Sequence, residues 1–298
     1  MKVIRSIIEL RQALKQYKVN HMGDSRIGLV PTMGYLHDGH ASLMTRAREM
    51  SDVVVVSIFV NPIQFGPGED YETYPRNEER DLALAERQGV DIVFIPTVDE
   101  MYPRPTKTKI IVSERTELLC GASRPGHFDG VTTVVSKLMN IVQPDLAFFG
   151  MKDAQQIAVL QQMVQDLNMD VEIVPCPIVR EKDGLALSSR NVYLSPEERK
   201  QALVLSRSLH EVKGELDCGK PVTTFQIREK LTSMIVTSSL AVIDYVQVLT
   251  FPELIPLQDY ELISDARDQV MMAVAVKFGT TRLIDNILFM PKEAVCLV

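Results

Sequence analysis

The sequence predicts an α/β protein, with a doubly wound, Rossmann-like parallel sheet domain followed by a smaller α+β C-terminal domain. Strand-like and helix-like segments alternate along the first part of the chain, the pattern of a parallel sheet with crossover helices. The run DVVVVSIF (52–59) is apolar without alternation, as in a central parallel strand that is covered on both faces. Near residue 180 the pattern changes to two helical segments followed by clustered strands.

Short apolar runs define the strands of the first domain. The expected strands are 27–30, 52–59, 91–96, 145–150 and 171–175. Helical spacing and helix-start signals, such as the capping box of Ser6 and Glu9, define the helices. These are expected at about 6–18, 40–50, 77–88, 129–142 and 153–167. Residues 61–76 contain three prolines and two glycines, so we expect a long loop, which is usually functional or mobile.

The second domain begins with a strong helix signal. Ser195-Pro196-Glu197-Glu198 offers an N-cap serine, a proline in the first turn and acidic residues behind it. Helices are expected at about 196–213 and 222–237, and strands near 242–249, 269–277 and 281–288. We therefore divide the chain into domains 1–178 and 179–298.

Bulk properties exclude several classes of protein. The 298 residues carry a net charge of −7, whereas a duplex nucleic-acid binder is usually basic. No apolar run reaches the ~18 residues that a membrane-spanning helix needs. Glu9 and Arg11 interrupt the apolar start of the chain, so it does not read as a secretory signal. Four cysteines without a C-x-x-C pair are typical of reduced thiols, and we expect a cytoplasmic protein.

Polar segments follow three of the expected strands. They are PTMGYLHDGH (31–40), VNPIQF (60–65) and MKDAQQ (151–156). Ligands of open α/β sheets bind at the carboxyl ends of the strands. Three such segments at one edge of a sheet predict a single site.

The first segment contains an H-x-G-H motif. A helix that starts near His40 would place His37 and His40 at its N-terminal end, which favours anions. Imidazole donors there can contact triphosphate oxygens and stabilise charge during phosphoryl or nucleotidyl transfer. These four residues alone fit a capped turn with two solvated histidines more often than a ligand site. A zinc pair is less favoured, because no third ligand is spaced nearby.

Two other segments offer groups for a phosphate chain. After the strand at 145–150, Gly150 allows close approach of a ligand, Lys152 supplies a charge, and Asp153 can accept from ribose hydroxyls. An exposed polar helix start explains the same residues. Ser188-Ser189-Arg190-Asn191 lies at the expected domain junction, where clefts are common, and a polar linker explains it equally well.

Neutral amides follow the strand at 52–59. Asn61 and Gln64 suit the hydroxyl and carboxylate of a hydroxy acid, although Asn-Pro is also an ordinary turn. The segment 124–128 can close over an anion, but its Pro-Gly pair favours a simple turn. GELDCGKP (214–221) fits a P-loop pattern except that Pro221 replaces the Ser or Thr, so we reject a P-loop. No G-x-G-x-x-G follows a strand, which argues against a dinucleotide dehydrogenase.

Taken in order, these motifs resemble those of the pantothenate synthetases, the pantoate–β-alanine ligase family. The matching segments are PTMGYLHDGH, SIFVNPIQF, YPR (74–76), RPGHFDGV (124–131), FFGMKDAQQ (148–156), DGLALSSRN (183–191) and RLIDN (282–286). They span roughly residues 2–290. Each motif is modest evidence, but the ordered set is highly specific.

The resemblance implies a nucleotidyltransferase-superfamily enzyme of the H-x-G-H type. It implies ATP-dependent adenylation of pantoate, then capture by β-alanine to give pantothenate, AMP and pyrophosphate. It further implies a Mg²⁺ requirement and a cytoplasmic homodimer that binds neither nucleic acid nor membrane. The first domain would bind nucleotide and pantoate, and the smaller domain and the 61–76 loop would act as lids.

The resemblance also implies roles for individual residues. From their donors and charges we expect His37, His40, Lys152, Ser188 and Ser189 to be catalytic, and the resemblance implies that His40 is the proton donor. The implied ATP-binding residues are Met33, Gly34, Tyr35, Leu36, His37, Asp38, Gly39, His40, Gly150, Met151, Lys152, Asp153, Val179, Leu187, Ser188, Ser189 and Arg190. Gln64 and Gln156 would hold pantoate, and Gln64 would also meet β-alanine. Asn61 is a further expected substrate-binding residue because of its neutral amide. Asp81 is the implied magnesium residue. Met151 stands where the family commonly has Glu.

Two other functions fit the same residues. A plain nucleotidyltransferase would stop at a nucleotidyl product, and a nucleotide-binding module would bind ATP without turnover. The first would release pyrophosphate without any amine, and the second would tolerate changes at His40 and Lys152.

Overall fold

The computed structural model describes residues 1–20 and 25–291. The chain divides into two compact units. The first contains Met1–Met151 and Val159–Val179, and the second contains Lys152–Ala158 and Arg180–Val298. The chain passes from the first unit to the second between Val179 and Arg180, next to the boundary expected near residue 178. The grouping of Lys152–Ala158 with the second unit has no counterpart in the sequence-based division, and the functional roles of the two domains stay predictions.

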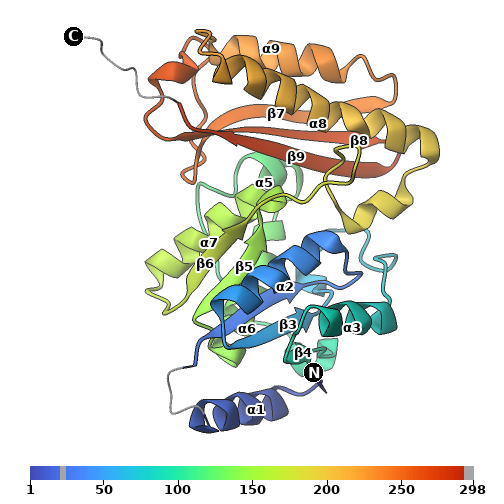
Figure 1. Ribbon diagram of the computed structural model, residues 1–298, viewed down its shortest axis with the longest axis vertical. Helices are drawn as coiled ribbons and strands as arrows, with labels where there is room; N and C mark the ends of the chain where they lie inside the picture. Colours follow the sequence, from blue (N-terminus) through green and yellow to red (C-terminus); the bar gives the residue numbers. More distant parts are fainter. Residues whose placement is uncertain (21–24, 292–298) are drawn as a thin grey trace. The chain divides into compact units, whose positions relative to one another are not determined.

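The first unit contains a six-stranded parallel sheet, and the apolar runs predict five of its strands (Figure 1). The strands follow the order β1-β4-β3-β2-β5-β6. Their bounds are β1 (Lys2–Ile4), β2 (Ile27–Thr32), β3 (Val53–Ile58), β4 (Ile92–Phe94), β5 (Leu146–Gly150) and β6 (Glu172–Cys176). The edge strand β1 pairs with β4 and is the one strand of this sheet that the sequence did not predict.

Helices connect these strands. Their bounds are α1 (Ile7–Asn20), α2 (Asp38–Met50), α3 (Glu78–Arg87), α4 (Val98–Met101), α5 (Leu119–Ser123), α6 (His127–Val142) and α7 (Ala154–Asp166), with 3₁₀ turns η1 (Pro62–Gln64) and η2 (Met151–Asp153). One face of the sheet packs against α2 and α3 through a cluster that includes Val54, Phe148 and Met44. Leu29 and Val55 alternate to the opposite face and are also fully buried. Both faces of the sheet are therefore covered, as in a doubly wound fold.

The second unit is the predicted smaller α+β domain. Its helices are α8 (Pro196–Asp217) and α9 (Thr224–Ile235), with 3₁₀ turns η3 (Ser189–Tyr193) and η4 (Ile263–Asp265). Its antiparallel sheet has the order β7-β8-β9, with β7 (Ala241–Phe251), β8 (Gln269–Phe278) and β9 (Thr281–Phe289). The expected capping box starts α8, because Ser195 Oγ accepts from Glu198 N and the Glu198 carboxylate accepts from Ser195 N.

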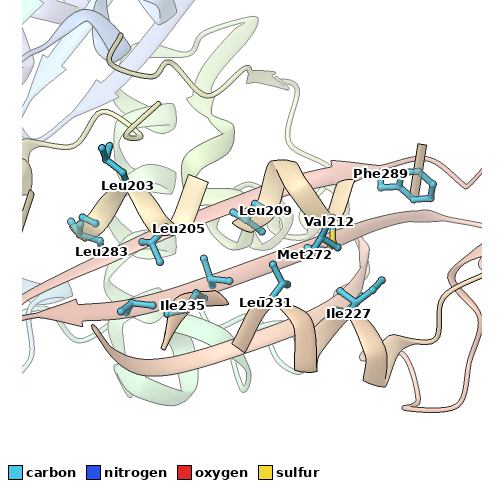
Figure 2. Packing of buried hydrophobic residues seen from close by; sticks show 14 of the residues in the cluster. Leu203, Leu205, Leu209, Val212, Ile227, Leu231, Ile235, Met272, Leu283 and Phe289 are labelled. Atoms are coloured by element: carbon cyan, nitrogen blue, oxygen red, sulfur yellow. The ribbon is translucent and has the colours of Figure 1, made fainter. Parts of the chain in front are cut away.

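Aliphatic side chains hold α8 and α9 against one face of this sheet (Figure 2). Leu205 and Leu209 of α8, Leu231 of α9 and Met272 of β8 belong to one cluster of side chains. All four are buried. The apolar stripe of α8 therefore packs in the core of this unit. The segment GELDCGKP forms the end of α8 and the turn after it, where Gly219 has a φ of +76°, rather than a strand-to-helix loop.

Within residues 1–20 and 25–291 there is no helix with the length and hydropathy needed to cross a membrane. Over the same ranges Cys120, Cys176 and Cys218 form no disulfide with one another. Cys296 lies outside the described residues.

Candidate active site

The strand order places the predicted segments at one edge of the sheet. The chain moves outward from β2 through β3 to β4, and outward on the other side from β5 to β6. The order therefore reverses between the neighbours β2 and β5, which is the point where ligands bind in open α/β sheets. PTMGYLHDGH leaves β2, Gly150 ends β5, and VNPIQF leaves the adjoining strand β3.

A strained turn follows β2. Gly34 has a φ of +88° and Tyr35 a φ of +51°, so both lie in the left-handed region that favours glycine. Thr32 Oγ1 accepts from Gly34 N at 3.2 Å. The carboxylate of Asp81, on α3, accepts from Tyr35 N at 2.8 Å and from Leu36 N at 2.7 Å. The turn is therefore held by side chains from two different elements.

The two histidines cap α2 together. His37 is the N-cap, and its Nδ1 accepts from Gly39 N at 3.1 Å. His40 Nδ1 accepts from His37 N at 3.3 Å, and the two ring centroids are 4.1 Å apart. The helix consequently begins at Asp38, two residues before the expected start, because this reciprocal cap satisfies its first N–H groups.

This cap determines the chemistry of the imidazoles. An Nδ1 that accepts a backbone N–H carries no hydrogen, so the hydrogen of each neutral ring is on Nε2. The capped turn and the anion site are therefore compatible. Nδ1 supports the helix, while Nε2–H is the donor at its N-terminal end, where anions are favoured.

Gln64 is held in place by a network of amides. Asn61 Nδ2 donates to Gln64 Oε1 at 3.1 Å, and Gln64 Nε2 donates to Met33 Sδ at 3.2 Å. Asn61 Nδ2 also donates to Gly130 O at 3.2 Å, and Asn61 Oδ1 accepts from Tyr102 OH at 2.8 Å. Asn61 is 1 % exposed, so its amide orients Gln64. Burial raises the pKa of Tyr102 to about 12, which keeps its hydroxyl a neutral donor.

The segment 124–128 fastens the η1 turn that carries Gln64. Arg124 donates to both carboxylate oxygens of Glu69, at 2.7 and 2.6 Å. Arg124 Nη1 lies 3.0 Å from His127 Nε2, and His127 Nδ1 lies 2.9 Å from the backbone oxygen of Gln64. With Arg124 as donor, Nε2 accepts and Nδ1–H donates to Gln64. This chain of contacts links a loop, a helix start and Gln64, and the spacing of these residues in the sequence does not reveal it.

Removing the charge of Glu69 should weaken this link in a pH-dependent way. Burial alone would raise the pKa of Glu69, but its hydrogen bonds and charge pairing with Arg124 hold the pKa below its ordinary value. The pair therefore adds stability above the unfolded-state pKa and loses it as the pH falls through the folded-state pKa. We expect Glu69→Gln to lower the free energy of unfolding by about 1–2 kcal/mol at pH 7. The difference from wild type should shrink below about pH 4.3.

Urea denaturation of both proteins from pH 7 to acid pH measures this difference. Glu72→Gln, at an exposed carboxylate of the same loop, is the matched control and should change little at any pH. A Glu69→Gln deficit that stayed constant down to pH 3 would contradict the role of the ion pair.

The second unit gathers another set of predicted residues. Lys152 and Ser188 line one small cavity of about 10 Å³, together with Asp285 of β9. Lys152 Nζ lies 3.5 Å from Asp153 Oδ2, and Lys152 O accepts from Asn286 Nδ2 at 3.0 Å. The cavity has about the volume of a single water, so it marks where these side chains meet rather than a ligand site.

A short 3₁₀ turn shapes the serine-arginine segment. Ser188 is the N-cap of η3, and its Oγ accepts from Arg190 N at 3.3 Å. Ser189 is buried, while Arg190, Leu187, Val179 and Gln156 are half-buried. Asp285, which the sequence analysis did not single out, pairs with Arg180 through two bonds of 2.6 and 2.9 Å. Its signal in the sequence was only its place in RLIDN.

Asp81 does not fit the magnesium role that the resemblance implies. It lines a cavity of about 260 Å³ that also contains Met33, Gly34, Arg76 and Glu78. It is nevertheless only 1 % exposed, and both of its oxygens accept backbone N–H groups. Glu78 pairs with Arg5 at 2.5 Å. The described part of the chain contains no group of three or more His, Cys, Asp or Glu side chains placed to hold a metal ion.

Comparison with known proteins identifies the family. Residues 2–288 match the pantoate-beta-alanine ligase family. The pantothenate synthetase of Acetivibrio thermocellus is 55% identical over 293 residues, which cover 97% of this chain and 99% of that protein. The crystal structure of pantothenate synthetase from Thermus thermophilus superimposes with a TM-score of 0.87 at 45% identity, covering 96% of this chain and 99% of that one.

A third relative was solved with ligands. The pantoate-beta-alanine ligase from Francisella tularensis, complexed with beta-gamma ATP and beta-alanine, is 33% identical and has a TM-score of 0.79. The match covers 98% of this chain and 99% of that one. Three observations point to the same family. They are the parallel sheet, the H-x-G-H cap where the strand order reverses between β2 and β5, and the matches over nearly the whole chain. This chain is a member of the pantoate–β-alanine ligase family.

Proposed function

We propose that this ligase joins pantoate to β-alanine through a pantoyl adenylate and releases AMP and pyrophosphate. The ATP-dependent condensation of pantoate with β-alanine is the reaction of its family. The observation that carries the adenylate route is the reciprocal histidine cap after β2. It supports two neutral Nε2–H donors at a helix N-terminus, where a triphosphate would bind.

The chemistry explains why such donors are useful. A carboxylate is a poor acyl donor, because oxide is a very poor leaving group. Attack of the pantoate carboxylate on the α-phosphorus of ATP forms an acyl–phosphate anhydride bond and releases pyrophosphate. The amine of β-alanine then attacks the carbonyl carbon, an amide bond forms, and AMP leaves. Both steps need positioning and stabilisation of phosphate charge more than proton transfer.

The proposed roles follow from these needs. His37 and His40 donate hydrogen bonds from Nε2–H to the phosphate chain, and His40 is the proposed donor at the departing oxygen. Lys152, Ser188, Ser189 and Arg190 are the other residues to which we assign charge and donors for the phosphate chain. The remaining ATP contacts are the backbone and side chains of Met33–Leu36, Asp38, Gly39, Gly150, Met151, Asp153, Val179 and Leu187.

The acid substrates are assigned to the amides. Gln64 and Gln156 would bind pantoate, and Gln64 would also meet β-alanine. The contact of Gln64 with Asn61 and Met33 supports a fixed orientation of its amide. The Francisella relative, which is complexed with beta-gamma ATP and beta-alanine, supports ATP and β-alanine as ligands of this chain.

Magnesium would enter as part of the substrate. Mg²⁺ prefers phosphate oxygens and water with one or two carboxylates, so an ATP–Mg²⁺ complex needs no dedicated protein cage. We also propose that the 61–76 loop and the C-terminal domain exclude water from the adenylate, and that the enzyme is a cytoplasmic homodimer.

Product analysis tests the adenylate route. Protein, ATP, Mg²⁺, pantoate and β-alanine should yield AMP and pyrophosphate in amounts equal to the pantothenate formed. ADP and phosphate instead would indicate an acyl-phosphate route. Pyrophosphate release that continues without any amine would favour a plain nucleotidyltransferase, and ATP binding without turnover would favour a binding module.

A further inference from the structure

We propose that Asp81 is a positioning residue that fixes the H-x-G-H turn, and that it does not bind magnesium. The inference rests on the proposed role of His37 and His40 in holding the triphosphate. The resemblance implies that Asp81 binds a metal, whereas in the structure its carboxylate accepts hydrogen bonds from two backbone N–H groups.

Two adjacent backbone N–H groups converge on this carboxylate. Oδ2 accepts from Tyr35 N at 2.8 Å, and Oδ1 accepts from Leu36 N at 2.7 Å. Leu36 is fully buried, so no water replaces the acceptor at that position. An ordinary amide has one acceptor oxygen, whereas this site needs two. A carboxylate is therefore the side chain that satisfies both donors.

The backbone at this place requires such support. Tyr35 is a non-glycine residue with a φ of +51°, and Gly34 precedes it at +88°. Left-handed conformations of non-glycine residues persist only where surrounding contacts hold them, and they gather at functional sites. His37 N-caps α2 directly after Leu36. The direction in which the chain leaves the turn therefore sets the position of both imidazoles.

We call the two hydrogen bonds from Tyr35 N and Leu36 N to the Asp81 carboxylate the clamp. The first turn of α3 holds this clamp in place. Asn77 caps α3 by accepting from Arg80 N at 3.1 Å, which fixes the helix start that carries Asp81. The guanidinium carbon of Arg80 lies 4.9 Å from the centre of the Tyr35 ring. Consecutive residues of α3 thus hold the backbone and the ring of Tyr35.

A metal role would leave these contacts unexplained. A magnesium ion bound to Asp81 would need a carboxylate oxygen that faces solvent or phosphate, but the residue is 1 % exposed. The cavity it lines contains Arg76 as well as Glu78, and Glu78 is already paired with Arg5, so the lining offers no surplus of negative charge for a cation.

Asp81→Asn tests the two roles, because it keeps the shape but removes one acceptor. If Asp81 positions the turn, kcat should fall about 10- to 100-fold, as expected for a misplaced catalytic group. The concentration of Mg²⁺ that gives half-maximal activity and the KM for pantoate should stay as in wild type. Glu79→Gln, an exposed carboxylate-to-amide change on the same turn, is the matched control and should leave kcat unchanged.

A spectroscopic readout is independent of the reaction. In ¹⁵N-labelled protein, His37 and His40 should show the Nε2–H tautomer, and Asp81→Asn should change both signals. His37→Ala and His40→Ala assign the signals among the five histidines. This readout stands even if the wild-type enzyme makes no pantothenate, so failure of the clamp and failure of the proposed function are distinguishable.

Several outcomes would overturn the inference. A Mg²⁺ requirement at least tenfold higher in Asp81→Asn, with full activity restored at high Mg²⁺, would establish a metal ligand. Wild-type kcat and unchanged histidine signals would also refute the clamp. If Asp81→Asn does not fold, the exposed change Arg80→Gln replaces it as the test. Loss of that cation–π contact should lower kcat about two- to fivefold without affecting the Mg²⁺ requirement, and an unchanged kcat would refute the clamp.

Discussion

His40→Ala and Lys152→Ala should each lower turnover by about 10²–10³-fold while the protein stays folded, the usual effect of losing one electrostatic stabiliser. Each change removes a donor or charge proposed to act on the phosphate chain. His37 still caps α2 in His40→Ala, because its Nδ1 accepts from Gly39 N independently of His40. Lys152 contributes its side chain to the small cavity with Ser188, and its backbone bond to Asn286 survives the substitution.

Steady-state kinetics with urea denaturation measures both effects. His210→Ala and Lys200→Ala, at exposed positions of α8, are the matched controls and should keep wild-type rates. The loss should appear in kcat as well as in kcat/KM, because the charge develops in the transition state. Wild-type turnover in both test variants would exclude the assigned roles and favour a binding module.

A second substitution separates the two nitrogens of His40. In His40→Asn the amide oxygen can replace Nδ1 as the acceptor for His37 N, but no group replaces Nε2. Stability should therefore exceed that of His40→Ala, while turnover stays as low. Recovery of turnover by asparagine would mean that the cap, and not Nε2–H, is what the reaction needs.

The sequence predicted the sheets because their signals are local. Four of the six parallel strands are runs with several Val, Ile, Leu or Phe residues that are buried on both faces, and these need no partner to be recognised. Strand β1 has three residues, and only Ile4 is buried, so its hydrogen bonds with β4 rather than its composition define it. Helix α2 begins at Asp38 rather than near His40, where the sequence predicted its start. Imidazoles are unusual N-caps, so ordinary capping rules do not predict this start.

The supporting contacts of the site were beyond sequence reasoning. Glu69 and Arg124 are 55 positions apart, and Asp81 lies 46 positions from Tyr35. A carboxylate that binds a metal, a guanidinium or two backbone N–H groups looks the same in a sequence. The choice among these partners depends on which elements the fold brings together, so the sequence alone could not show that Asp81 accepts two backbone N–H groups or that Glu69 pairs with Arg124.

Gly130→Ala should be the most damaging small substitution near the proposed pantoate site. A Cβ at residue 130 would lie 2.5 Å from Gln64 Cα and 2.5 Å from Ile63 O, which are both backbone atoms. Backbone cannot rotate away as a side chain can, so η1 must move relative to α6. We expect a loss of stability of about 1–3 kcal/mol, the usual cost of overpacking. Because Gln64 moves with η1, kcat/KM for pantoate should fall about 10²-fold.

The control for this change is Gly214→Ala in α8. Nothing lies within 4 Å of a Cβ there, and alanine favours a helix over glycine by about 0.8–1 kcal/mol. That variant should be slightly more stable than wild type and fully active.

Pantoate kinetics and urea denaturation of both variants measure the two expected losses in Gly130→Ala. If Gly130→Ala lost stability but kept wild-type kcat/KM for pantoate, Gln64 would not be the pantoate ligand, because its displacement would have cost nothing. If it lost neither, the close packing of α6 on η1 would not exist in solution. Loss of both stability and kcat/KM for pantoate in Gly130→Ala, with Gly214→Ala unaffected, would show that the position of the Gln64 amide determines how efficiently pantoate is used.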